Sequence, residues 1–282
     1  MLDRRDLLKL APAILVPGRE ARASPGGYCE FRAKASVLVL SIPILHRDKV
    51  GAGFFRYEEQ DAGGRKHLRL EFGAGSVPER AAGLNRMGLF EESIVERRGS
   101  LERAEYFGFM TSSPEENIEQ AKSALASGAA PGVSAIRGRI ENGRIVNRLA
   151  RLTGLRHTGW TRWRDVTAEV RDRLEREGAG DVERDAAGEP VHTFLYAVRA
   201  AMHDDQMLVR SFVHNGEIYR LRTEPAADGA GITRITGKIS KGGSRSETSF
   251  RLWCERSAPH APVRFEFRPR SFLRLTFERV SS

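Results

Sequence analysis

The chain has 282 residues, of which 40% are hydrophobic and 29% are charged, and its formal net charge is +9. This composition is typical of a globular protein that buries a full core, and it excludes a disordered chain. The basic residues are spread along the sequence instead of alternating with aromatic residues in one tract, so we expect no nucleic-acid partner.

The beginning of the chain has the pattern of an export signal. Arg4 and Arg5 precede a short apolar run, and the small-residue triplet Ala21-Arg22-Ala23 ends the segment. A basic start, an apolar middle and a small-residue exit are typical of secretory signals, and paired arginines indicate the twin-arginine type. We therefore expect a signal over 1–23, a single β-rich domain over 24–282, and a periplasmic or secreted protein. The alternative is an amphipathic first helix.

The expected compartment decides how the two cysteines are interpreted. An oxidising compartment permits a disulfide bond between Cys29 and Cys254, and we expect this bond in an exported chain. Two buried free thiols that act as small apolar residues are the alternative.

The first half of the domain is predicted to consist mainly of β-strands. Apolar and polar residues alternate, as in half-buried strands, over 28–42, 50–59, 65–72 and 89–110. Turn residues divide these runs into hairpins. The strongest of these signals is the type I′ pair Asn142-Gly143.

Three segments have the periodicity and the end signals of α-helices. They cover 112–128, 165–178 and 193–203, and the third is largely apolar. The polar loop over 178–190, between the last two helices, is the candidate sub-boundary within the domain.

From Gln206 onward the pattern is almost purely β and predicts an antiparallel meander of six strands. One face of the last strands is apolar, with Val263, Phe265 and Phe267, and the other face is charged. We therefore predict an α+β fold that is mainly antiparallel β. It would be a large curved sheet, forming a barrel or half-barrel, with about three helices packed on it or capping it. No stretch is apolar for long enough to cross a bilayer as a helix, so we expect no transmembrane span in the mature chain.

The C-terminal third of the chain carries a family resemblance. Its features are the segments "TFLYAVRAA" and "NGEIYRL", a strand ending near Trp253, and the strand "PVRFEF" that begins at Pro262. These features resemble a bacterial family of exported proteins of unknown function, of the domain of unknown function 3108 type. The resemblance implies a β-rich periplasmic or envelope protein and transfers no catalytic residue. The chain departs from the family pattern at Cys254.

No sequence motif for catalysis or for a cofactor is present. The chain lacks the G-x-S-x-G elbow of hydrolases and the G-x-G-x-x-G turn of dinucleotide-binding folds, so we expect no cofactor. His203, Asp204 and Asp205 are candidate metal ligands, and a polar helix end is the favoured alternative. The stretch 73–77, "GAGSV", could cradle a phosphate, but a plain turn is the favoured interpretation.

Aromatic clusters supply the candidate binding residues. Tryptophan and arginine alternate in "HTGWTRW", and such side chains can stack on a ligand or pair with an anionic head group. The predicted ligand-binding residues are Phe107, Phe109, Trp160, Arg162, Trp163, Arg164, Phe265 and Phe267. A filled core is the alternative role of the aromatic residues.

These observations favour a non-enzymatic exported protein that binds or scaffolds. Its partner would be an apolar or anionic amphiphile, or another envelope protein. The alternative is a periplasmic hydrolase that uses a metal or general acid–base catalysis, at His203 and its neighbours or near His157.

Overall fold

The computed structural model describes residues 23–39, 42–77, 79–81, 85–111, 123, 132–157, 159–186, 189–241, 247–270 and 273–280. The expected export signal, apart from Ala23, and the helix expected over 112–128, apart from Ser123, lie outside these residues.

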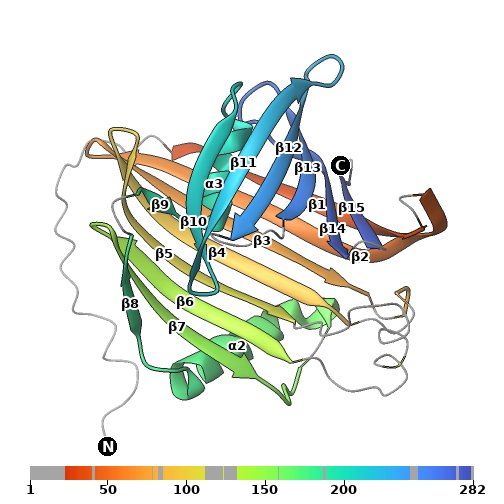
Figure 1. Ribbon diagram of the computed structural model, residues 1–282, viewed down its shortest axis with the longest axis horizontal. Coiled ribbons are helices and arrows are strands. Elements are labelled where there is room, and N and C mark those ends of the chain that lie inside the picture. Colours follow the sequence, from red (N-terminus) through yellow and green to blue (C-terminus); the bar gives the residue numbers. More distant parts are fainter. Residues whose placement is uncertain are drawn as a thin grey trace, which may run out of the picture.

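One large sheet contains all the strands of the described part of the chain (Figure 1). Its first half comprises β1 (Ala23–Val39), β2 (Ile42–Ala62), β3 (Arg65–Ser76), β4 (Met87–Arg97), β5 (Ser100–Thr111), β6 (Val133–Glu141), β7 (Arg144–Leu152) and β8 (Val182–Asp185). Its second half comprises β9 (Val191–His192), β10 (Leu208–His214), β11 (Glu217–Ala227), β12 (Ile232–Lys241), β13 (Glu247–Glu255), β14 (Pro262–Arg270) and β15 (Leu273–Arg279). The sheet runs from β8 back to β1 and then from β15 back to β9, and only the β9–β10 pair is parallel.

Local turn chemistry explains why consecutive strands pair. Asn142 and Gly143 have φ values of 51° and 76°, the left-handed pair that a type I′ hairpin requires. The first and last strands also pair: β1 runs antiparallel to β15, from Phe31 opposite Arg279 to Val37 opposite Leu273. No local sequence pattern predicts this pairing.

The sheet is open, although its ends approach each other. In the part of the chain that the structure describes, the terminal strands β8 and β9 do not pair with each other. A side-chain contact nevertheless connects the two end regions of the sheet, because Arg184 on β8 forms an ion pair with Glu217 on β11 (3.2 Å). The predicted mainly antiparallel curved sheet is therefore confirmed as one large open sheet. The polar loop expected over 178–190 contains β8.

Two α-helices occur among the described residues, fewer than the three or so that we predicted. They are α2 (Trp163–Glu177), preceded by the 3-10 turn η2 (Trp160–Arg162), and α3 (Phe194–Met202). They lie on opposite faces of the sheet: α2 packs against β6 and β7, whereas α3 lies between the two halves of the sheet, in contact with β3, β4, β10 and β11 (Figure 1). Neither helix is long and apolar enough to span a membrane.

The alternation of side chains gives the first half of the sheet two buried faces. Leu70, Ile94 and Ala104 are fully buried on the inner face, which faces α3 and the second half of the sheet. Leu89 and Phe109 are buried on the outer face, under α2. A sheet covered on both sides in this way needs both faces to be apolar where the helices pack.

The predicted disulfide bond is wrong, because Cys29 and Cys254 are both buried free thiols. Cys29 lies on β1 and Cys254 on β13, and two strands, β15 and β14, separate them in the sheet. Neighbouring strands are about 4.8 Å apart, which makes about 14 Å along the sheet, whereas a disulfide needs Cα atoms within about 7 Å. The alternative of two buried thiols describes the structure.

Candidate functional site

The outer face of the sheet, beside α2, brings most of the predicted binding residues together. The helix is held there by its apolar stripe, because Val166, Val170 and Leu174 are fully buried against the sheet. This four-residue spacing places the three side chains on one face of a helix. The opposite flank of α2 remains available for contacts.

Glu169 fixes the loop that leads into α2. Its buried carboxylate accepts hydrogen bonds from the backbone N–H groups of Arg156 (2.9 Å) and His157 (3.2 Å). Burial would raise the pKa of Glu169, but these hydrogen bonds and the charge of Arg156 hold it below its usual value. These hydrogen bonds attach Arg156 and His157 of the loop to the middle of α2.

Two glycines on β3 form a socket for Trp160. A Cβ atom at Gly73 would lie 3.0 Å from the Trp160 ring, and one at Gly75 would lie 2.8 Å from it. Only glycine lets the indole approach the strand this closely. The stretch "GAGSV" therefore belongs mainly to β3, and the structure gives its glycines a packing role.

Trp160 and Trp163 belong to a row of aromatic rings on the outer face. The two indoles stack with their centroids 6.1 Å apart, and Trp163 lies 5.0 Å from Phe54. Phe54 in turn stacks on the exposed ring of Tyr28. The row is rigid because Phe54 and Trp160 are almost completely buried.

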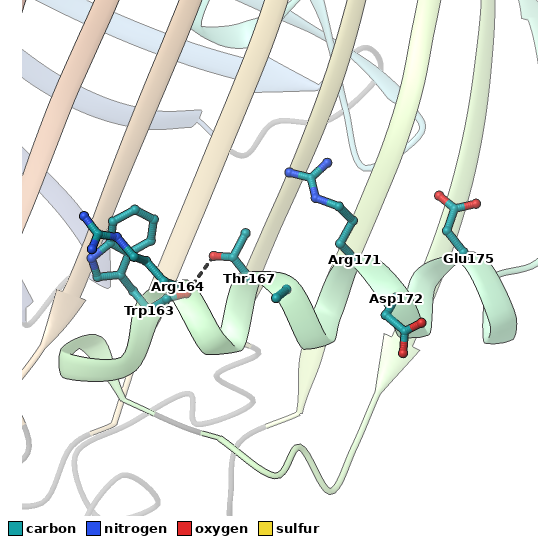
Figure 2. A pocket seen from close by; sticks show the side chains of 7 residues that line it. Trp163, Arg164, Thr167, Arg171, Asp172 and Glu175 are labelled. Carbon is teal, nitrogen blue, oxygen red and sulfur yellow. Dashed lines mark hydrogen bonds between the residues drawn. The ribbon is translucent and has the colours of Figure 1, made fainter. Parts of the chain in front are cut away.

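A groove of about 480 Å³ runs along the flank of α2, beginning at Trp163 (Figure 2). The groove is shallow, and much of it is open to solvent. Figure 2 shows that Trp163, Thr167 and Glu175 project to the same side of the helix, whereas Asp172 points away. Trp163, Arg164, Thr167, Ala168, Arg171, Asp172 and Glu175 line the groove.

Most of the charges that line the groove are already neutralised. Arg171 pairs with Glu91 on β4 (2.9 Å), and its guanidinium lies 4.0 Å above the Phe107 ring. Asp172 pairs with Arg176 (2.7 Å). At the far end, Glu175 pairs with two strand arginines, Arg137 and Arg148.

Arg164 is the exception among these charges. Its guanidinium lies 5.2 Å from the centre of the Trp163 ring. Among the residues that the structure describes, no carboxylate lies within ion-pair distance of it. The neighbouring Arg162 pairs with Asp165 (3.0 Å) and does not line the groove.

The other predicted binding residues do not line the groove. Phe107 and Phe109 are buried under α2 as part of its packing surface. Phe265 lies on the inner side of the sheet, where it stacks on Phe277 with a centroid distance of 4.4 Å. Phe267 is half-buried on the same strand as Phe265. The sequence therefore grouped residues that belong to two different layers.

The candidate metal ligands do not form a ligand set. Asp204 accepts the backbone N–H of Gln206 (2.9 Å) in a turn, and His203 stacks edge-on against His260. Burial, followed by the charge of Arg199, lowers the pKa of His203 to about 4. The described residues contain no group of three or more side chains suited to hold a metal ion.

One polar array was not anticipated from the sequence. The Ser36 hydroxyl lies 3.0 Å from Nδ1 of His46, whose Nε2 lies 3.2 Å from Asp48. Ser36 and His46 are directly opposite each other on β1 and β2. The only sequence signal is the alternation that places His46 and Asp48 on one face of a strand, and this signal does not reveal the partner strand.

Comparisons with known proteins leave the family open. No family model matches the chain, and no curated protein matches it in sequence. Among solved structures, the chain is similar to the "Beta-barrel-like Protein of Domain of Unknown Function DUF1849" from Brucella abortus. The match has a TM-score of 0.48 and 7% sequence identity, and it covers 93% of this chain and 98% of that one.

Proposed function

We propose that this is an exported, non-enzymatic binding protein that holds an amphiphilic molecule in the groove beside α2. The observation that carries the proposal is the junction of a rigid aromatic row with a groove in which one cation, Arg164, has no partner. Aromatic side chains provide contact area at low entropic cost, and an unpaired guanidinium provides a polar anchor.

The N-terminal pattern of paired arginines, apolar run and small-residue exit supports the exported location. The resemblance to the domain of unknown function 3108 type points to the same compartment. It falls on α3 and on the strands β10 to β15, away from the groove. A scaffold that carries its binding surface on a separate part of the sheet is consistent with this arrangement.

Tryptophan fluorescence tests the proposal, because one of the three tryptophans, Trp163, lines the groove and a second, Trp160, stacks on it. The variant Trp253→Phe leaves Trp160 and Trp163 as the only emitters. A brominated stearic acid, added below its micelle concentration, should quench their emission saturably. Emission that stays unchanged at all concentrations would contradict the proposal.

A second candidate function, a serine hydrolase, is favoured by the array of Ser36, His46 and Asp48. His46 could take the Ser36 proton as the hydroxyl oxygen attacks an ester carbonyl, and then return it to the leaving alcohol. Water would release the acyl group from Ser36. Ser36 is largely buried, and here Nδ1, not Nε2, faces the serine.

Labelling with a fluorophosphonate decides between the two functions. A hydrolase would be labelled as the wild type and not as Ser36→Ala. An unlabelled wild type, or equal labelling of both proteins, excludes the array as a catalytic site.

A further inference from the structure

Building on the proposed function, we infer that the groove selects amphiphiles with a carboxylate head group, which Arg164 binds at the Trp163 end of α2. The occupant would be a single-chain fatty acid whose apolar chain lies along the flank of the helix.

The charges around the groove determine where an anion can bind. Arg171, Asp172 and Glu175 each have an oppositely charged partner, so an incoming ion would have to displace that partner. Arg164 carries the one uncompensated charge among the described lining residues. A carboxylate can therefore pair with Arg164 without breaking an existing ion pair.

The surroundings of Arg164 orient its guanidinium. The Trp163 ring beneath it is held from one side by Trp160 and from another by Phe54. A guanidinium stacked on a fixed ring loses less freedom on binding than a free side chain does. Arg164 also lies in the first turn of α2, where the helix dipole favours negative charge.

Next to this end, the groove offers apolar contacts. The Thr167 hydroxyl donates a hydrogen bond to the Trp163 carbonyl oxygen (2.7 Å), so the side chain's polar group is already satisfied (Figure 2). Ala168 follows, and the guanidinium of Arg171 is stacked on Phe107. An acyl chain can cover this surface while its head group stays at Arg164.

Paired probes test the head-group selectivity in the Trp253→Phe background at alkaline pH. The probes are a brominated stearic acid and the glycerol monoester of the same acid, which has no charge. The protein that carries only Trp253→Phe should bind the acid more tightly than the ester. Arg164→Gln should weaken binding of the acid by about tenfold, a factor that corresponds to about 1.4 kcal/mol, and should leave the ester unchanged.

Arg162→Gln is the matched control, because Arg162 is also exposed, lies two residues away and already pairs with Asp165. This variant should keep the preference for the acid. Equal affinity for the two probes, or equal loss in both variants, would overturn the selectivity while leaving the binding function intact. Failure of both probes to quench would overturn the selectivity and the binding function together.

Discussion

The carboxylate of Glu92 accepts a hydrogen bond of 2.5 Å from the hydroxyl of Thr193, although 101 residues separate the two in the sequence. The same carboxylate accepts the backbone N–H groups of Leu195 (2.7 Å) and Tyr196 (2.9 Å). Glu92 on β4 therefore caps the first turn of α3 from outside the helix. This contact positions α3 between the two halves of the sheet.

Further carboxylates hold the same helix. Glu59 on β2 pairs with Arg199, and Glu96 on β4 accepts the hydroxyl of Tyr196. The inner face of the first half of the sheet thus binds α3 through polar contacts along its length as well as through its apolar side chains.

Stability should depend on the protonation of Glu92. Burial raises the pKa of Glu92 to about 7, against 4.5 for an exposed carboxyl. Because the folded protein holds this proton more tightly than the unfolded chain, the stabilising contribution is complete below pH 4.5 and is lost as the pH rises through 7. Over this interval the change is on the order of 3 kcal/mol.

The variant Glu92→Gln isolates this contribution. Urea unfolding at several pH values should show that the free energy of unfolding of the wild type exceeds that of the variant by the largest amount at acidic pH. The difference should shrink as the pH rises. A difference in the free energy of unfolding that stays constant with pH would contradict this prediction.

The pH dependence of stability that comes from His214 should have the opposite sign to that from Glu92. Burial among Phe90, Phe194 and Tyr219 lowers its pKa to about 4, against 6.5 when exposed. The folded protein binds this proton less tightly, so stability is lost as the pH falls from 6.5 towards 4. Replacement by leucine should reduce the loss of unfolding free energy over this range. If His214→Leu and the wild type lose stability in parallel, the histidine is not responsible.

The glycine socket of Trp160 predicts a coupled pair of substitutions. Gly75→Ala places a Cβ atom 2.8 Å from the indole, so it should destabilise the protein by about 1–3 kcal/mol. In a protein that already carries Trp160→Leu, the same change should cost less, because the ring atom at 2.8 Å is gone, but part of the cost should remain, since the Cβ atoms of residue 160 (2.9 Å) and Met87 (3.0 Å) still approach the new Cβ atom. Additive costs in chemical unfolding would show that the two residues do not share a packing contact.

Local patterns predicted much of this fold. The stripe Val166, Val170 and Leu174 predicted α2, and Gly178 ends it as expected. Asn142-Gly143 predicted its hairpin. "HTGWTRW" predicted that Trp160 and Trp163 would act together, because the two residues are close in sequence.

Features that depend on distant strands could not be obtained in this way. Strand order is not visible in a periodicity, so the separation of Cys29 from Cys254 was not foreseen. For the same reason, the sequence did not show that Phe265 and Trp163 lie in different layers. The cap of α3 by Glu92 requires a contact across 101 residues, and the unpaired state of Arg164 depends on which carboxylates the fold brings near it.

Native mass spectrometry with sodium oleate tests the central claim, a ligand groove beside α2, most directly. Ala168→Trp fills the groove at an exposed position, whereas Glu177→Trp adds the same side chain at an exposed position on α2 that neither lines the groove nor pairs with a residue that does. The proposed groove predicts a single bound oleate on the wild type and on Glu177→Trp, and none on Ala168→Trp. A wild type without oleate, or an Ala168→Trp protein that still carries it, would contradict the account.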